Sequence, residues 1–118
     1  MVSSEKPMSE DRLQQECFLW YHSTYPEYRG LLFHVGNGGS RSAREGAKFK
    51  TMGVWAGVSD FIFLFDSRAY FIELKTLKGT QSIKQKVWEQ QVKNQGFQYS
   101  IIRSLEEFKS LIKEILSS

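Results

Sequence analysis

Several features that define other classes of protein are scarce in this sequence. One cysteine in 118 residues excludes a disulfide within the chain, and a free thiol suits a reducing cytoplasm. Two histidines without metal-ligand spacing, and no CxxC motif, give no basis for a zinc site. No apolar run approaches the roughly 18 residues that a membrane span requires. The polar, acidic start of the chain is unlike a signal peptide, so we expect residues 1–8 to form a short disordered lead.

The composition that remains is that of a soluble globular domain. Apolar residues make up 41% and charged residues 25%, and 118 residues suffice for one hydrophobic core but not for two. We therefore expect a single domain over residues 9–118, in the cytoplasm and without a membrane segment. Cys17 shares helical spacing with Leu13, Trp20 and Tyr21, which favours a buried structural thiol over a nucleophile.

The net charge of +3 is small, but it is unevenly distributed along the chain. Residues 34–58 hold four basic side chains against one acid, Glu45, and so carry +3 by themselves. A glycine-rich segment at 36–39 precedes these cations, and a positive field over such a loop would attract a polyanion such as DNA. A solvated helix face explains the same charges as an alternative. The candidate DNA contacts are Asn37, Gly38, Arg41, Arg44, Lys48 and Lys50.

Helix caps, chain breakers and apolar patterns divide the chain into alternating helices and strands. Capping boxes are predicted at Ser42, Ser82 and Ser104, a simple N-cap is predicted at Ser9, and Pro26 ends the first helix. The predicted elements are helix 9–25, strand 31–35, helix 42–52, strands 60–65 and 69–76, helix 82–95, strand 97–102 and a helix from 104 onward. This order, αβαββαβα, predicts an α/β fold with a mixed sheet of about four strands and helices on its faces.

Three charged residues are predicted to meet at one end of a hairpin. Glu73 and Lys75 lie two positions apart in strand 69–76, so both side chains point to the same face of the sheet. The short loop at 66–68 pairs this strand with strand 60–65. Asp60 then lies opposite the end of the strand that carries Glu73 and Lys75.

This cluster favours the hydrolysis of a phosphodiester. Two carboxylates at one place repel each other and need a compensating cation. Their oxygen ligands suit Mg²⁺ or Mn²⁺, which keep waters for phosphate oxygens, and the backbone carbonyl of Leu74 is a further candidate ligand. Lys75 beside them can orient or activate a water, or stabilise charge on the phosphate. An exposed sheet face with a cross-strand ion pair is the alternative interpretation.

The segments around these residues resemble a known family. GVWAGVSDF (53–61), YFIELKT (70–76) and GTQSIKQ (79–85) are similar in order and spacing to the VRR-NUC family, the virus-type replication–repair nucleases of the PD-(D/E)xK superfamily. Segment 35–39, the helix at 43–50 and the final strand and helix extend the resemblance over nearly the whole chain. It implies a restriction-endonuclease-like core. Ser59 stands where the superfamily's name calls for proline, which removes no ligand.

The resemblance implies metal-dependent DNA cleavage. Asp60 and Glu73 would ligate Mg²⁺ or Mn²⁺, and Lys75 would serve the nucleophilic water. Stand-alone members of the family tend to be homodimers that resolve four-way (Holliday) junctions, and a dimer provides two sites for two symmetric cuts. The implied partners are therefore DNA and a second copy of the chain, with no small-molecule cofactor, in a bacterial cell or a phage-infected host.

Two further site residues follow from the same resemblance. Gln85 would assist at the site, although its place in a capping box also explains a glutamine there. Glu16 would supply an additional acid, directly to the metal or through a water. Three other polar residues share the helix of Glu16 and leave this assignment open: Glu10, Asp11 and Gln15.

Other interpretations stay open on the sequence. A DNA-binding module of a repair or replication assembly could keep the fold and cleave little or nothing. Trp55 could stack on a base or sugar, plug the site or contact a second copy of the chain.

Overall fold

The computed structural model describes residues 8–36 and 43–118, without the side chains of Ala43 and Arg44. The elements are α1 (Glu10–Thr24), the 3₁₀ helix η1 (Pro26–Tyr28), β1 (Leu32–His34), α2 (Ala43–Thr51), β2 (Phe61–Phe65), β3 (Arg68–Leu74), α3 (Ile83–Asn94), β4 (Gln98–Ile102) and α4 (Leu105–Ser117). The predicted order is confirmed, with η1 as an additional turn after α1. The predicted lead and the cap at Ser42 lie outside the described residues, except for Met8.

The four strands form one mixed sheet in the order β1-β2-β3-β4. The first three strands pair antiparallel, and β4 runs parallel to β3 because α3 carries the chain back between them. The β2–β3 hairpin is tighter than predicted: Phe65 pairs with Arg68, so two residues make the turn instead of three. Asp66 and Ser67 both have positive φ, 52° and 62°, as a two-residue turn of the right twist requires.

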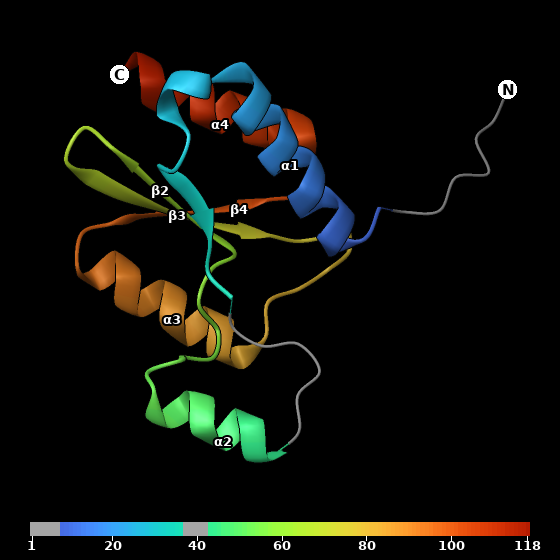
Figure 1. The fold of residues 1–118 in the computed structure, drawn as a ribbon, viewed down its shortest axis with the longest axis vertical. Helices are drawn as coiled ribbons and strands as arrows, with labels where there is room; N and C mark the ends of the chain where they lie inside the picture. Colours follow the sequence, from blue (N-terminus) through green and yellow to red (C-terminus); the bar gives the residue numbers. More distant parts are fainter. Residues whose placement is uncertain (1–7, 37–42) are drawn as a thin grey trace, which may run out of the picture.

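The helices cover the two faces of the sheet unequally. Figure 1 shows α1 and α4 together on one face, α3 on the other, and α2 beyond α3 on the side away from the sheet. Strand residues alternate between these faces, so every second side chain enters the core under α1 and α4. That core consists of Leu13, Cys17, Tyr21, Leu32, Phe61, Phe63, Tyr70, Ile72, Leu74, Ile102, Phe108, Ile112 and Ile115.

The core follows the predicted apolar patterns. Phe61 and Phe63 are fully buried, and each such phenylalanine stabilises the fold by about 1.5–3 kcal/mol relative to an exposed ring. Cys17 is also fully buried, which confirms a structural thiol, and burial raises its pKa to about 12. No helix in the described residues is long and apolar enough to cross a membrane.

The ends of α3 and α4 are capped in different ways. Ser82 and Gln85 form the predicted capping box at the start of α3. At α4 the Ser104 hydroxyl accepts from the Glu107 N–H, as predicted, but the Glu107 carboxylate accepts from the Arg103 N–H at 2.7 Å. A capping box would require the Glu107 carboxylate to accept from the N–H of Ser104 itself. The capping box predicted at Ser104 is therefore wrong in this second hydrogen bond.

Candidate active site

Asp60 is held at the end of the hairpin by the strands on both sides. It immediately precedes β2. Extending the antiparallel register by one residue beyond the pair Phe61 and Ile72 places Asp60 opposite Glu73. Its Oδ2 accepts a 2.7 Å hydrogen bond from the Leu74 N–H of β3. Its backbone carbonyl accepts from the Val35 N–H at 3.0 Å, in line with β1.

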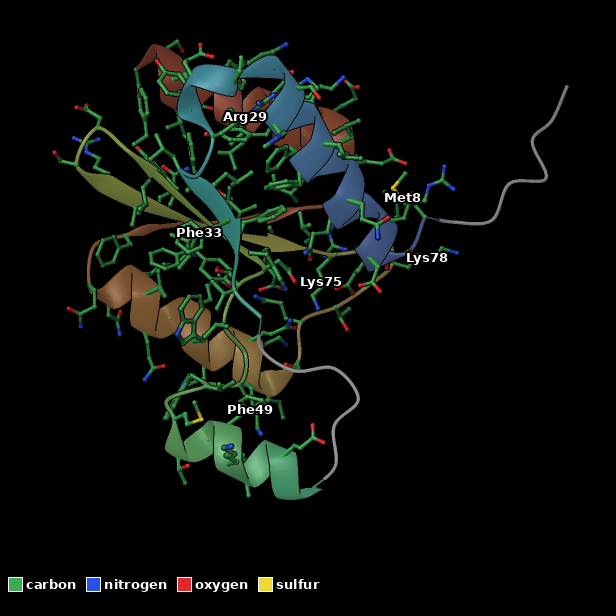
Figure 2. The ribbon with its side chains drawn as sticks, in the orientation of Figure 1. Met8, Arg29, Phe33, Phe49, Lys75 and Lys78 are labelled. Atoms are coloured by element: carbon green, nitrogen blue, oxygen red, sulfur yellow. The ribbon has the colours of Figure 1, made fainter. Side chains whose placement is uncertain are left out.

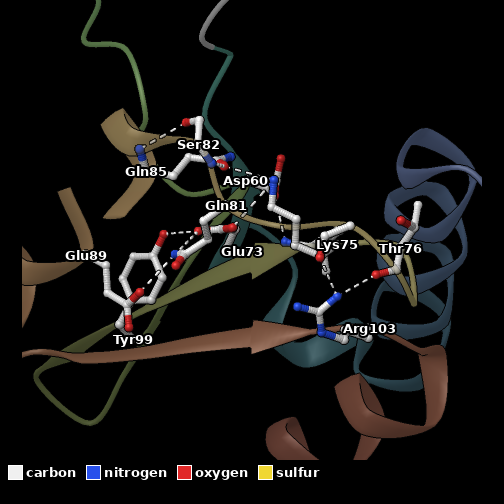
Figure 3. Close-up of polar contacts among 12 residues, drawn as sticks. Asp60, Glu73, Lys75, Thr76, Gln81, Ser82, Gln85, Glu89, Tyr99 and Arg103 are labelled. Carbon is white, nitrogen blue, oxygen red and sulfur yellow. Dashed lines mark hydrogen bonds and ion pairs between the residues drawn. The ribbon is translucent and has the colours of Figure 1, made fainter. Parts of the chain in front are cut away.

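Glu73 is buried, with 1% of its surface exposed, on the α3 face of the sheet. Its Oε1 accepts from the Tyr99 hydroxyl at 2.5 Å and from the Gln81 amide at 3.0 Å. The same Gln81 nitrogen donates to Glu89 at 2.8 Å, so one amide joins Glu73 to α3 (Figure 3). Glu73 Oε2 is buried and has no hydrogen-bond partner among the described residues.

Lys75 completes the cluster from the position after β3. It is 6% exposed, and its Nζ lies 3.7 Å from Glu73 Oε2. The same Nζ donates to Gln85 Oε1 at 2.8 Å. That oxygen also accepts from the Ser82 N–H at 2.8 Å. Gln85 thus completes the capping box and holds the Lys75 ammonium at the same time. The sequence leaves open whether Gln85 is a helix cap or a site residue, and its side chain makes both contacts.

Glu10 of α1 is an acid whose charge interacts with those of Asp60, Glu73 and Lys75. Its spacing places it on the same helix face as Leu13 and Cys17, which are buried against the sheet. Partial burial raises the pKa of Glu10, Lys75 lowers it, and Asp60 and Glu73 raise it again.

Glu16, the acid expected from α1, is not brought to the site. It lies on a flank of α1, where it accepts from Arg12 at 3.0 Å in an exposed ion pair one helical turn away. In the sequence, the apolar stripe of α1 favours Glu10, because buried Leu13 and Cys17 lie three and seven positions after it. Glu16 is the direct sequence neighbour of Cys17 and so points away from that stripe.

The electrostatics are those of carboxylates held out of water. Burial raises the pKa of Asp60, the Leu74 hydrogen bond lowers it, and the charge of Glu73 raises it further. Burial and the neighbouring Glu73 carboxylate also raise the pKa of Tyr99, which keeps the Tyr99 hydroxyl a proton donor.

The segment after Lys75 is fixed by Arg103, which follows β4. Its Nη1 donates to the backbone carbonyls of Thr76 and Gly79, at 2.7 Å each, and of Leu77 at 3.4 Å (Figure 3). Tyr99 and Arg103 were not predicted as part of the site. They reach it because β4 runs parallel beside β3, and the local pattern of β4 carries no sign of that neighbour.

The donor set fits a hard divalent cation. Glu73 Oε2 has no hydrogen-bond partner among the described residues and lies 3.7 Å from the Lys75 ammonium. The charge of Glu73 acts on Asp60, and the Leu74 carbonyl points to the same edge of β3 as the Leu74 N–H, which donates to Asp60. Within the described residues no three His, Cys, Asp or Glu groups come together, so neither Glu10 nor Glu16 completes such a cluster. Mg²⁺ needs only one or two carboxylates when waters and phosphate oxygens supply its other ligands.

The structure places only part of the predicted DNA interface. Lys48 and Lys50 are exposed on α2. Asn37, Gly38, Arg41 and the side chain of Arg44 lie outside the described residues.

Comparisons with known proteins find similarity among solved structures. Models of known families and curated proteins yield no match. Among solved structures, a VRR_NUC domain protein superposes with a TM-score of 0.76 at 23% identity, over 93% of this chain and 89% of that one. The fold is thus restriction-endonuclease-like, as predicted. In particular it is the fold of that VRR_NUC domain protein, so the predicted resemblance is confirmed at the level of the fold.

Proposed function

We propose that this protein is a Mg²⁺- or Mn²⁺-dependent DNA endonuclease. The observation that carries the proposal is Glu73 Oε2, a buried carboxylate oxygen without a hydrogen-bond partner among the described residues, next to Asp60 and Lys75. Burying such an oxygen costs stability unless something binds it, and a cation is the partner that two neighbouring carboxylates select. The shared fold with a VRR_NUC domain protein supports the same function.

Each residue of the cluster has a task in phosphodiester hydrolysis. Asp60, Glu73 and the Leu74 carbonyl would hold the cation, which when bound lowers the pKa of a water and offsets phosphate charge. Lys75 would orient the attacking water and stabilise the charge that develops on the phosphate. Gln85 fixes the position of the Lys75 ammonium through a 2.8 Å hydrogen bond, and the first turn of α3 fixes Gln85.

The proposed substrate is branched DNA, with a homodimer acting on four-way junctions. Two copies related by a two-fold axis would present two sites to two symmetric strands. Lys48 and Lys50, exposed on α2, would contact phosphates. Glu10 would add negative charge near the site, whereas the role predicted for Glu16 is that of an additional acid for the metal, directly or through a water.

Cleavage of labelled DNA tests the proposal. Duplex, flap, single-stranded and four-way-junction DNA are each incubated with Mg²⁺ or Mn²⁺, and Lys75→Ala is compared with Lys78→Ala. Lys78 is the matched control because it is an exposed lysine three residues further along. We expect paired cuts on the junction from the native protein and Lys78→Ala, and a loss of at least about 100-fold in Lys75→Ala.

The same assay, with sedimentation of the free protein, separates the other outcomes. DNA binding without turnover in either metal would identify a non-catalytic DNA-binding module. Full activity in Lys75→Ala would contradict the assigned site. A monomer that makes single cuts would contradict the dimeric resolvase but leave the endonuclease in place.

A further inference from the structure

An apolar groove lies on the side of α3 that faces α2. It encloses about 390 Å³, within the range of roughly 300–1,000 Å³ typical of ligand sites. It lies between α2, the segment that follows α2 and the outer face of α3, in the region where these elements are neighbours in Figure 1. The lining residues that bear on its ligand are Lys50, Trp55, Ile83, Lys84 and Val87.

Trp55 is the main aromatic surface of the groove. Its side chain is 63% exposed, and no other aromatic ring packs against it within the described part of the chain. Trp20 and Trp88, in contrast, make edge-to-face contacts with neighbouring rings. Ile83 and Val87, at 81% and 53%, are exposed beside it. Exposed apolar side chains gathered in one groove are typical of a binding surface, because a ligand that covers them removes their apolar area from water.

The charge of the groove selects the kind of ligand. Lys50 and Lys84 line it, and its lining residues include no acid. A ligand with an apolar face and negative charge meets both features, as a nucleobase with its phosphate does. A two-fold contact with a second copy would instead bring each Lys50 and Lys84 toward the same cations of the partner.

The groove and the candidate active site contact neighbouring residues of α3. Gly57, two residues after Trp55, packs so tightly on α3 that an added Cβ would lie 2.6 Å from the Lys84 carbonyl oxygen. The next residue of α3, Gln85, holds Lys75. Figure 2 shows Lys75 on the sheet side of α3 and Phe49 on the α2 side. A nucleic-acid strand laid across the first turn of α3 would therefore pass both the groove and the candidate active site at Lys75.

We infer that the groove binds an unpaired nucleobase of a DNA strand, stacked on Trp55, with the adjoining phosphates at Lys50 and Lys84. This inference rests on the proposed function in that it takes DNA as the ligand. It gives the enzyme a means to prefer branched DNA, because a base in a continuous duplex is already stacked on its neighbours and cannot reach Trp55. Stacking on an aromatic side chain strengthens the binding of a base whatever its identity.

The test compares two DNA ligands in metal-free buffer, where no cleavage occurs. Both are labelled duplexes with a short single-stranded extension, 5′ or 3′, and in one of them the extension is abasic. Fluorescence anisotropy should show about 10-fold tighter binding of the ligand whose extension carries bases. Trp55→Ala should remove this difference, and Trp55→Phe should retain part of it. Leu19→Ala is the matched control, because Leu19 is 61% exposed on α1 outside the groove.

The remaining outcomes overturn the inference. Equal affinity of the native protein for both ligands, or an undiminished preference in Trp55→Ala, would show that no base occupies the groove. Dissociation of a dimer by Trp55→Ala in sedimentation would identify the groove as a contact between copies. Metal-dependent cleavage without base-dependent binding would contradict the groove alone. Base-dependent binding without cleavage by the native protein would contradict only the endonuclease.

Discussion

Two carboxylates, Asp60 before β2 and Glu73 in β3, are partly or fully buried at the candidate site, which opposes folding. Glu73 is held by Tyr99 and Gln81 on one oxygen and has no hydrogen-bond partner on the other among the described residues. Asp60 is partly buried, and the charge of Glu73 acts on it. Two negative charges that are buried close to each other oppose folding, and natural proteins retain such clusters where function needs them.

Asp60→Asn should therefore stabilise the metal-free protein. Burial and the charge of Glu73 raise the pKa of Asp60 in the folded state. The native protein thus loses stability as pH rises through that raised pKa, and it bears no such penalty below the ordinary pKa of an unfolded aspartate, about 3.9. We expect a gain of about 1 kcal/mol at pH 8, or roughly 4 °C in Tm, that shrinks toward acid pH.

Urea unfolding at a series of pH values measures this effect. Glu114→Gln, which removes an exposed carboxylate from α4, is the control and should change stability little at any pH. A loss of stability in Asp60→Asn at pH 8 would show that the hydrogen bond to the Leu74 N–H outweighs the burial of the charge.

Gln85→Ala and Ser82→Ala should separate the two tasks of Gln85. Each removes one half of the capping box and should cost about 1 kcal/mol of stability. Only Gln85→Ala frees the Lys75 ammonium, so only this variant should lose about 10-fold or more in kcat, with KM little changed. Equal losses of kcat in the two variants would reduce Gln85 to a helix cap.

At the scale of elements, the start of α3 organises the site. Its first turn holds Lys75 through Gln85, and the segment that precedes it contributes Gln81 to Glu73. The segment after α2 packs against the same turn through Gly57. The turn after β3 is tied to Arg103 beyond β4. The candidate site is thus assembled from β3, the first turn of α3 and the short segments next to them.

Gly57→Ala should be much more damaging than Gly53→Ala. Both glycines have positive φ, 90° and 95°, where a side chain costs about 1–2 kcal/mol. At Gly53 the added methyl group meets nothing within 4 Å, whereas at Gly57 it would lie 2.6 Å from the Lys84 carbonyl oxygen. We expect a loss of about 1 kcal/mol at Gly53 and at least about 3 kcal/mol at Gly57, measured by urea unfolding. Similar losses at both positions would mean that the contact with α3 yields easily.

At the scale of the whole molecule, the two faces of the sheet do different work. The face under α1 and α4 is a continuous apolar core. The α3 face combines aromatic packing of Phe71, Trp88 and Tyr99 with the buried polar cluster. The apolar layer thus supports a layer in which charged side chains are buried.

Divalent cations should raise the stability of the whole domain. A ligand present at about 10 times its Kd stabilises the folded state by roughly 1.4 kcal/mol, which is about 5–6 °C for a domain of this size. We expect Mn²⁺ to raise the Tm of the native protein by about this amount and to leave Glu73→Gln unchanged. An equal rise in both proteins would place cation binding outside the candidate site.

Local signals in the sequence predict most of the fold and the centre of the site. Apolar periodicity, caps and breakers mark the helices and strands, because these depend on neighbouring residues. The spacing of Glu73 and Lys75, with the short loop back to Asp60, predicts their convergence because a hairpin links residues that are close in sequence.

Contacts between residues distant in sequence were decided only by the tertiary structure. Tyr99 and Arg103 reach the site because β4 lies parallel to β3, and the groove at Trp55 exists because α2 returns to the outer face of α3. Glu10, and not Glu16, shares the helix face of buried Leu13 and Cys17, because the packing of α1 decides which of its faces meets the sheet. Such contacts arise from the way the apolar faces of the helices and the sheet pack together, and no local pattern specifies which partner each face will find.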